Sequence, residues 1–396
     1  MSNSDEGRPG TAFTAMSLAD GETACTMIES AQITEQVATT GTNASVAPRA
    51  RSTAAPAIAI ARWFDSSAAR IGPDADDERI DWPRVIPFIG MHLACLGVFR
   101  VGFSWFALWA ALVLYALRMF ALTGFYHRYF SHRAFKTSRT VQFVFALVGA
   151  TCVQRGPLWW AAHHRDHHRH ADTEQDIHSP LRHGFLWSHM GWFLTPRGFR
   201  TRWESIRDLE RYRELRWLDR YDIALPALLA VGLFFLGRRV GAAYPASGTS
   251  GAQLLIWGFF VSTVVLFHAT VTINSLAHRF GTRRFPTRDN SRNNWLLALL
   301  TFGEGWHNNH HHFPGSARQG FRWWEIDLTY YLLRLLAACG MIWDLKPIPA
   351  GLARSRNGHH DVRSGRLRDV GPHEPALPGR PLTVAVGART AGRNGT

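Results

Sequence analysis

The sequence predicts an all-α membrane protein with four transmembrane helices, arranged as two hairpins, and a helical cap on the cytosolic side. Three observations predict this fold. Apolar runs are concentrated in the middle of the 396-residue chain, while both ends are polar. The runs come as two close pairs. Segments rich in histidine and arginine follow the second and the fourth run.

The four apolar runs have nearly the length that a bilayer requires. A hydrocarbon core of roughly 30 Å is spanned by about 20 helical residues. The third run has a short apolar core, Ile223–Leu236, so we expect its helix to continue over Tyr221 or Arg238. Buried helices in a soluble protein are the alternative explanation. The expected spans are residues 85–103, 105–124, 221–238 and 254–273.

Both ends of the chain are expected to be disordered. Residues 1–80 are rich in Ser, Thr, Ala, Gly and Asp without an apolar period, and residues 349–396 are rich in Gly, Arg and Pro. Segments of this composition bury too little apolar surface to fold. The membrane domain is therefore expected at residues 81–348, with its cap at 125–220 and 274–348.

The basic surplus is carried by arginine. The formal net charge is +14, and Lys136 and Lys346 are the only lysines. Arginine is dense in the expected cap, so the positive-inside rule places the cap and both termini in the cytoplasm. The skew toward Arg, Ala and Gly indicates a GC-rich genome and hence a bacterial cell membrane. The sequence carries no zinc-finger or RNA-binding signature, so we expect a lipid membrane as partner and no nucleic acid.

Most of the 20 histidines fall into clusters with helical spacing. In a helix, positions i, i+3 and i+4 share one face. HxxHH therefore aims three imidazoles at a single point, and NxxxH does the same for an amide and an imidazole. His127 and His132 lie about 140° apart on an ideal helix, so one of them should sit where the helix frays. The clusters are HRYFSH at 127–132, HRDHH at 164–168, NSLAH at 274–278 and HNNHH at 307–311.

Together the clusters predict a centre with more than one metal ion. Nine imidazoles and an amide exceed what one tetrahedral zinc needs, and they suit two metals of higher coordination number. Histidine binds iron, copper, nickel and zinc alike, so these residues leave the identity of the metal open. Outside the clusters, His178 is a candidate for orienting a ligand. His268 is expected to hydrogen-bond to a neighbouring helix.

These elements closely resemble the membrane fatty-acyl desaturase family, and within it the stearoyl-CoA Δ9 branch. The resemblance is carried by the four clusters and by GEGWHNNHHHFP at 303–314, and it covers roughly residues 85–348. It implies a mushroom-shaped protein whose cytosolic cap holds a histidine-rich di-iron site. The metal ligands that it implies are His127, His132, His164, His167, His168, His278, His307, His310 and His311, with Asn274 acting through a bound water.

The resemblance also implies an activity. An O2-dependent oxidoreductase of this kind introduces a cis double bond, here at Δ9, into a saturated acyl chain during fatty acid biosynthesis. A fatty acyl-CoA would lie on the cap with its tail in a kinked tunnel running past two Fe2+ ions. Animal members carry an Arg-Asp pair where this chain has Ala162 and His163. The carrier therefore stays open between CoA, a carrier protein and a phospholipid.

Electrons are expected to come from a separate protein. The sequence has no HPGG haem-binding motif, so a fused cytochrome b5 domain is not expected. A ferredoxin, or cytochrome b5 with its reductase, is the kind of donor that the resemblance implies.

The closed end of the tunnel is expected between the two hairpins, on the membrane side of His127. Tyr115 and Met119 precede that histidine by about three and two helical turns, and we expect them to help set the length of the acyl chain. Trp160 is a third candidate for the tunnel wall. Plain helix packing explains these residues equally well.

Two other functions stay open at this point. A histidine-box hydroxylase of alkyl or lipid chains would use the same metal site, although GEGWHNNHHHFP and NSLAH favour desaturation. A membrane metal-binding or transport protein would place its ligands within the spans near mid-membrane. The clusters here lie at the expected cytoplasmic ends of the spans instead.

Overall fold

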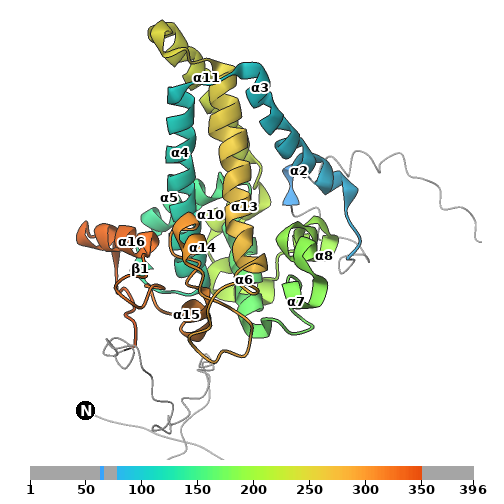
Figure 1. The fold of residues 1–396 in the computed structure, drawn as a ribbon, viewed down its shortest axis with the longest axis vertical. Coiled ribbons are helices and arrows are strands. Elements are labelled where there is room, and N and C mark those ends of the chain that lie inside the picture. The colour runs from blue at the N-terminus through green and yellow to red at the C-terminus, as the bar shows by residue number, and fades with distance from the viewer. Residues whose placement is uncertain (1–62, 67–77, 350–396) are drawn as a thin grey trace, which may run out of the picture. The chain divides into compact units, whose positions relative to one another are not determined.

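The computed structural model describes residues 63–66 and 78–349. The disorder expected for residues 1–80 and 349–396 therefore concerns segments that lie almost wholly outside the described residues. Helices dominate the described part. Its only sheet pairs β1 (Lys136–Thr137) with β2 (Ile342–Trp343) in antiparallel register, with Lys136 opposite Trp343. The all-α prediction is confirmed (Figure 1).

Four helical stretches in the described residues are long and apolar enough to cross a membrane, as the sequence predicted. The long helices lie side by side in Figure 1, and the shorter elements gather around their lower ends. The four stretches are Trp82–Val101 (α2 Trp82–Ala94, η2 Cys95–Gly97, α3 Val98–Val101), Trp105–Ser131 (α4 Trp105–Phe120, η3 Ala121–Ser131), Ala224–Ala243 (α11) and Gly251–Ser275 (α12 Gly251–Gln253, η8 Leu254–Val261, α13 Ser262–Ser275).

Two of these helices end at least five residues beyond the predicted residue. The second was expected to end at residue 124 and runs to Ser131, because a π-helical segment continues α4. The third was expected at 221–238 and covers Ala224–Ala243, so Arg238 lies inside it. Gly237 allows α11 to approach the start of α12 closely. A Cβ on Gly237 would lie only 2.5 Å from the carbonyl oxygen of Ser250.

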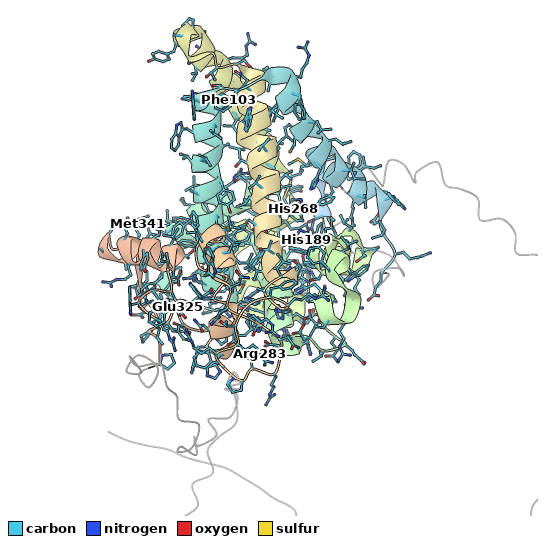
Figure 2. The ribbon with its side chains drawn as sticks, viewed as in Figure 1. Phe103, His189, His268, Arg283, Glu325 and Met341 are labelled. Carbon is cyan, nitrogen blue, oxygen red and sulfur yellow. The ribbon has the colours of Figure 1, made fainter. Side chains whose placement is uncertain are left out.

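The chain reverses sharply between α3 and α4. Gly102 has a φ of +71°, a left-handed conformation that favours glycine. Ser104 then caps α4 by accepting a hydrogen bond from the Ala107 amide. The hydroxyls of Ser104 and Thr249 are 2.8 Å apart, so the two hairpins are joined at the end far from the cap, which Phe103 marks in Figure 2.

Arg118 is a buried charge within α4. Its guanidinium donates to the hydroxyls of Ser262 and Thr263 on α13, at 2.5 and 2.7 Å, and more weakly to the carbonyl oxygen of Thr151 at 3.4 Å. A charge inside a span is tolerated when neighbouring polar groups satisfy it. Arg118 therefore ties the first hairpin to the second.

The remaining helices are short. The longest are α5 (Arg139–Ala150) and α6 (Pro157–His170), which both pack against η3. A further short turn, η7 (Pro245–Ser247), joins α11 to α12. The others are α7 (Pro180–His183), η4 (Trp187–Gly191), η5 (Trp192–Leu194), α8 (Pro196–Phe199), η6 (Trp203–Ser205), α9 (Arg207–Glu210), α10 (Arg213–Arg220), α14 (Trp295–Leu300), α15 (His307–His312) and α16 (Leu328–Ala338).

The main hydrophobic core lies where η3 meets these short helices. Phe125 stacks on Phe145 of α5 with the ring centroids 3.9 Å apart. Tyr126 packs so closely on Gly149 that a Cβ there would fall 2.2 Å from the tyrosine ring. Full burial of a large apolar side chain stabilises the fold by about 1.5–3 kcal/mol. The core therefore fixes η3, the segment that carries His127.

Candidate metal centre

The first histidine cluster is shaped by a π-helix. The His132 amide donates to the carbonyl oxygen of His127 at 3.3 Å, an i→i+5 bond of the kind found at functional sites. His132 directly follows the last residue of η3, so one of the two histidines does sit where the helix ends. The π-turn, which was not predicted, brings the two rings to 4.9 Å between centroids.

Nine imidazoles of the described residues gather into two groups, and within each group the potential ligand atoms lie within 4.8 Å of one another. All nine histidines that the sequence singled out belong to one group or the other. The first histidine group contains His127, His132, His164, His168 and His310. The second histidine group contains His167, His278, His307 and His311.

Each HxxHH cluster contributes to both groups, which corrects the expectation that its three imidazoles converge on one point. On α6, His164 and His168 join the first group and His167 joins the second. On α15 the division is reversed, with His310 alone in the first group. Positions i and i+4 are about 40° apart around a helix, whereas i+3 lies about 100° from i+4. The two helices therefore bridge the groups, and the rings of His168 and His311 are 4.4 Å apart.

The ring nitrogens converge in a way that fits a bound cation. Nε2 of His310 lies 3.0 Å from Nε2 of His127 and 2.9 Å from Nε2 of His168. A neutral imidazole has one donor and one acceptor nitrogen, so such a meeting of three nitrogens leaves lone pairs facing one another. In the second group, Nε2 of His311 is buried without a hydrogen-bond partner. Converging imidazole lone pairs are the donor set that divalent transition metals prefer.

Burial favours the neutral form that metals bind at six of the nine imidazoles, whereas at His167 the charge of Asp176 outweighs burial and raises the pKa. In the second group, desolvation lowers the pKa of His311 to about 4, although the nearby carboxylate of Asp289 opposes this shift. In the first group, desolvation and neighbouring histidines hold the pKa well below its ordinary value at His132, His164, His168 and His310.

Four of the nine imidazoles pair through Nδ1 with a carboxylate. In each pair Nδ1 faces the carboxylate, which leaves Nε2 to coordinate a metal. Partners of this kind fix the tautomer and the ring orientation, and they raise the basicity of the ligand. The pairs are His167 with Asp176 (3.0 Å), His278 with Asp172 (3.0 Å), His311 with Asp289 (2.8 Å) and His127 with Glu304.

These carboxylates were not predicted. Glu304 lies three residues before His307 in GEGWH, and Asp172 and Asp176 lie four and eight residues after His168. Their closeness in sequence to the histidine clusters was therefore an available signal. Proximity does not reveal the partner, because Asp172 pairs with a histidine 106 residues away. His178, the one residue predicted to orient a ligand, lies 3.5 Å from Asp176, and its ring centroid is 4.4 Å from that of His167.

Asp172 occupies its place in a strained backbone conformation. Its φ is +60°, a region that residues other than glycine seldom adopt. Its carboxylate also accepts hydrogen bonds from the Asn290 amide and the Ser179 hydroxyl, both at 2.7 Å. Burial alone would raise the pKa of this carboxyl, but the hydrogen bond and charge of His278 outweigh burial and lower the pKa to about 2. Asp172 is therefore ionised at neutral pH.

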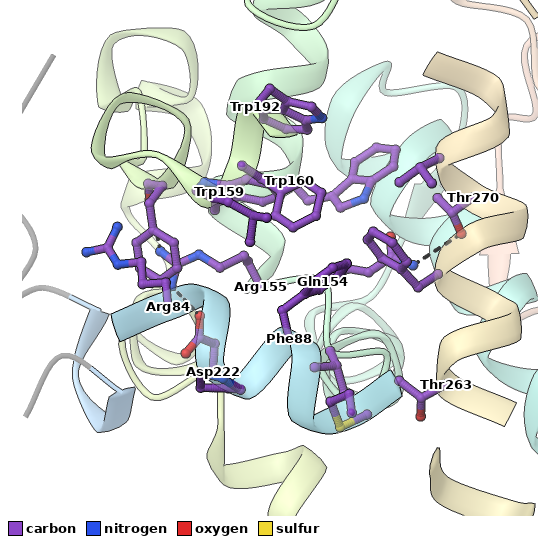
Figure 3. A pocket seen from close by; sticks show the side chains of 18 of the residues that line it. Arg84, Phe88, Gln154, Arg155, Trp159, Trp160, Trp192, Asp222, Thr263 and Thr270 are labelled. Atoms are coloured by element: carbon purple, nitrogen blue, oxygen red, sulfur yellow. Dashed lines mark hydrogen bonds and ion pairs between the residues drawn. The ribbon is translucent and has the colours of Figure 1, made fainter. Parts of the chain in front are cut away.

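A cavity of about 290 Å3 opens beside the metal centre (Figure 3). Its lining is mainly apolar and includes Arg84, Arg155 and His164. In the wall of this cavity, Gln154 donates a hydrogen bond to the hydroxyl of Thr270 at 3.2 Å. A cavity of this kind, apolar with a few placed polar groups, is typical of a small-molecule or lipid site.

A smaller cavity of about 50 Å3 adjoins the larger one. Trp160 and Asn274 line both, and Met119 lines the smaller one. Tyr115 is not among the residues that line either cavity, because its side chain points to α14, where its hydroxyl donates to the carbonyl oxygen of Leu300 at 2.6 Å. The role expected for Tyr115 in chain length stays a prediction.

The arginines at the rim of the larger cavity are paired with carboxylates. Arg155 lies 2.6 Å from Asp222, and Arg84 lies 3.2 Å from Asp81. Both guanidinium groups stack on the ring of Phe199, at 3.4 and 3.5 Å from its centroid. Burial raises the pKa of Asp222 to about 6, against the lowering effect of Arg155. Each of these two cations is therefore matched by an acidic group.

Residues 103–341 match the family model described as fatty acid desaturase. An acyl-CoA 5-desaturase of Anemone leveillei is 40% identical over 261 residues, which cover 65% of this chain and 77% of that protein. An sn-1 stearoyl-lipid 9-desaturase of Anabaena variabilis is 35% identical over 278 residues, 68% of this chain and 94% of that protein. A delta-9 acyl-lipid desaturase of Arabidopsis thaliana is 36% identical over 287 residues, 70% and 87% of the two chains.

Proposed function

Because the chain belongs to the fatty acid desaturase family, we propose that it is an O2-dependent acyl desaturase whose two histidine groups hold two iron ions. The observation that carries the proposal is the convergence of nine buried imidazoles beside an apolar cavity. Removing hydrogen from an unactivated methylene is beyond acid–base catalysis by side chains. The bound irons supply the oxygen chemistry that this step requires.

The chain's own residues would bind the iron ions, orient the alkyl chain and keep water away from it. The imidazoles of both groups bind the ions, and the carboxylates behind four of them hold those rings in place. The apolar cavity keeps the alkyl chain away from water. Overall, one double bond consumes O2, two electrons and two protons and releases two molecules of water.

We propose that the alkyl chain passes Trp160. This ring stacks on that of His164 with the centroids 5.1 Å apart, and it lines both cavities. A chain lying along Trp160 would bring a methylene next to the first histidine group and its end toward Met119. Positioning matters strongly, because a displacement of about 1 Å can cost roughly 100-fold in rate.

The finer parts of the proposal rest on the sequence motifs and on the names of relatives. GEGWHNNHHHFP and the two relatives named for position 9 support a cis Δ9 double bond, whereas another relative is named for position 5. The distribution of arginine supports a bacterial cell membrane with the metal centre and both termini on the cytoplasmic side. Electrons would come from a separate ferredoxin, or from cytochrome b5 with its reductase.

Gas chromatography–mass spectrometry of total fatty acids tests the activity. The full chain is expressed with a ferredoxin and its reductase, and derivatives locate the double bonds. We expect a new monounsaturated acid that disappears in His164→Ala and persists in His170→Ala, which changes the same helix outside both groups. A hydroxy acid with the same histidine dependence would overturn desaturation in favour of hydroxylation, and the absence of any product with the donor present would contradict both.

A further inference from the structure

Three histidines outside the metal centre form a hydrogen-bonded chain. His92 of α2 and His268 of α13 face each other with their Nε2 atoms 3.0 Å apart, and Nδ1 of His268 lies 3.0 Å from Nε2 of His189 in η4. None of the three belongs to either histidine group. Figure 2 shows His268 and His189 beside the lower half of α13. The hydrogen bond expected between His268 and a neighbouring helix is thereby confirmed.

The order of donors along this chain is fixed at one end. The carbonyl oxygen of Phe88 can only accept, so Nδ1 of His92, at 2.8 Å, carries the proton. In the neutral chain Nε2 of His92 then accepts from His268, which accepts in turn from His189. At the other end of the chain, Nδ1 of His189 lies 2.9 Å from the Ser275 hydroxyl, which donates to the carbonyl oxygen of Val271 at 3.0 Å. The Nε2 atoms of His92 and His268 are paired with each other only while α2 stays beside α13.

Between its ends, α2 is held to α13 by a few side chains. Near the start of α2, Arg84 stacks on Phe199 of α8. Beyond the end of α2, a Cβ on Gly97 of η2 would lie 2.7 Å from Ile256 of η8. Between these points the helices are bridged by the His92–His268 bond and by Phe88 against Phe267, with centroids 5.4 Å apart. In Trp82–Val101 only 11% of the most apolar stretch is buried, whereas in Gly251–Ser275 the buried share is 44%. We call this region the α2–α13 window.

The larger cavity lies directly behind the α2–α13 window. Phe88, Met91 and His92 of α2 line it, as do Val264 and Phe267 of α13. The same side chains that close the window therefore form the cavity wall. Because both helices are long and apolar enough to cross a membrane, the other side of this wall faces the acyl chains of the bilayer.

The rim of the cavity suits a headgroup with little net charge. Arg84 lies in the first turn of α2, two residues after the exposed Trp82, and tryptophan is enriched at the membrane interface. His92 lies eight residues further along, which is about 12 Å deeper at 1.5 Å per residue. Because Arg84 and Arg155 are each matched by a carboxylate, the rim offers little excess positive charge to a polyanionic carrier such as CoA. Polar groups at the interface with an apolar cavity beyond them match the layout of a membrane lipid.

We infer that the larger cavity takes the acyl chain of a membrane glycerolipid, which enters sideways from the bilayer through the α2–α13 window. The inference rests on the proposed desaturase function and names its substrate class. His92, His189 and His268 act as a latch that holds the window closed when no chain is passing. A substrate that is already anchored in the bilayer then needs no path through water.

A reversible cross-link across the window tests the inference in proteoliposomes. The four native cysteines are replaced by alanine, and His92→Cys with His268→Cys is bridged by a bis-methanethiosulfonate reagent. The probe is phosphatidylcholine whose sn-1 stearoyl chain carries a photoreactive diazirine at carbon 9. We expect bridging to lower photolabelling of the cavity residues at least tenfold and reductant to restore it. Labelling that survives bridging would overturn the inference.

A matched pair controls for the cross-link itself. Leu233→Cys with Gly258→Cys joins α11 to η8, where a Cβ on Gly258 would lie 3.4 Å from Leu233, and it leaves α2 untouched. Bridging this pair should not change labelling. A second variant, His92→Ala, removes the latch without a cross-link and should raise the initial labelling rate at least threefold. An unchanged rate in His92→Ala would contradict the latch.

Photolabelling does not require turnover, so this test separates the inference from the proposed function. Stearoyl-CoA with the same diazirine is run in parallel. Cavity labelling by the CoA probe with none by the phospholipid would overturn the glycerolipid inference and leave desaturation standing. Failure of the proposed function would show instead as a chain that takes up the lipid but forms no double bond when iron and an electron donor are supplied.

Discussion

Both histidine groups consist of imidazoles, but they differ in the carboxylates that pair with those imidazoles. In the second group, Asp172, Asp176 and Asp289 each accept a hydrogen bond from one of the four imidazoles. In the first group, Glu304 stands behind His127, and the other four imidazoles have no carboxylate pair among the described residues. The difference shows how one ligand type can give two unlike metal positions.

The carboxylate of Glu304 also has polar partners other than His127. Arg128 and Gln319 both donate to this carboxylate at 3.1 Å, and Arg128 also pairs with Asp327 at 2.9 Å, so part of the negative charge of Glu304 is already balanced. Asp172 and Asp176 also accept from neutral backbone amides, at 2.7 and 2.9 Å. A carboxylate partner makes an imidazole a stronger donor to a metal. The second group should therefore bind its ion more tightly than the first.

Removing a ligand should have the largest effect. His168→Ala takes one imidazole from the first group, and we expect a loss of activity beyond the roughly 10–100-fold typical of losing an outer partner. Iron content, measured by mass spectrometry of the purified protein, should fall by one ion per chain. His170→Ala on the same helix should keep both ions. Full iron content in His168→Ala would contradict the assignment of that residue.

Removing a carboxylate from the second group should have the next largest effect. Asp176→Asn keeps the size of the side chain but not its charge, and we expect the affinity of the second group for Fe2+ to fall roughly 10–100-fold. Stepwise Fe2+ titration of metal-free protein should then show the tight step weakened and the weaker step unchanged. A titration that matches wild type would remove the basis of the comparison between the groups.

The equivalent change in the first group should have a smaller effect. Glu304→Gln removes a charge that Arg128 balances in part, so we expect a loss of affinity of about tenfold, at the low end for such partners. The same Fe2+ titration measures it. If Glu304→Gln weakens iron binding more than Asp176→Asn does, the proposed order of the two groups is wrong.

Acid should destabilise the metal-free protein below neutral pH. The unfolded chain takes up protons at histidine near pH 6.5, whereas burial lowers the pKa of six of the nine folded imidazoles, to about 4 at His311. His167, whose pKa is raised beside Asp176, contributes in the opposite direction. The unfolded state then binds more protons, so stability falls as pH drops below about 6.5. The loss of stability due to His311 is complete near pH 4. The loss due to the first group extends to still lower pH values. Thermal unfolding between pH 7.5 and 5 checks this, and a flat profile would contradict it.

The sequence predicted those features that depend on local spacing. Apolar runs of bilayer length gave four helices at nearly the observed positions, and histidines at i, i+3 and i+4 gave six of the nine imidazoles of the two groups, while HRYFSH and NSLAH gave the other three. Both signals follow from the helical repeat, which is visible within one segment. The second and third helices end later than predicted, because η3 continues the second and the residues after Arg238 continue the third.

The features that depend on distant contacts were not predicted. The pairing of Asp172 with His278 joins residues 106 positions apart, and no local period encodes it. The division of each HxxHH cluster between two groups needs the mutual orientation of α6 and α15. The chain of His92, His189 and His268 likewise joins three separate elements. Such contacts follow from packing and not from spacing.

Mössbauer spectroscopy of the purified protein loaded with 57Fe tests the central claim most directly. The account predicts two iron ions per chain in two unequal, nitrogen-rich environments, with the tighter site filling first as iron is added and weakening in Asp176→Asn. A single metal ion per chain, or two ions that fill together with identical spectra, would contradict it.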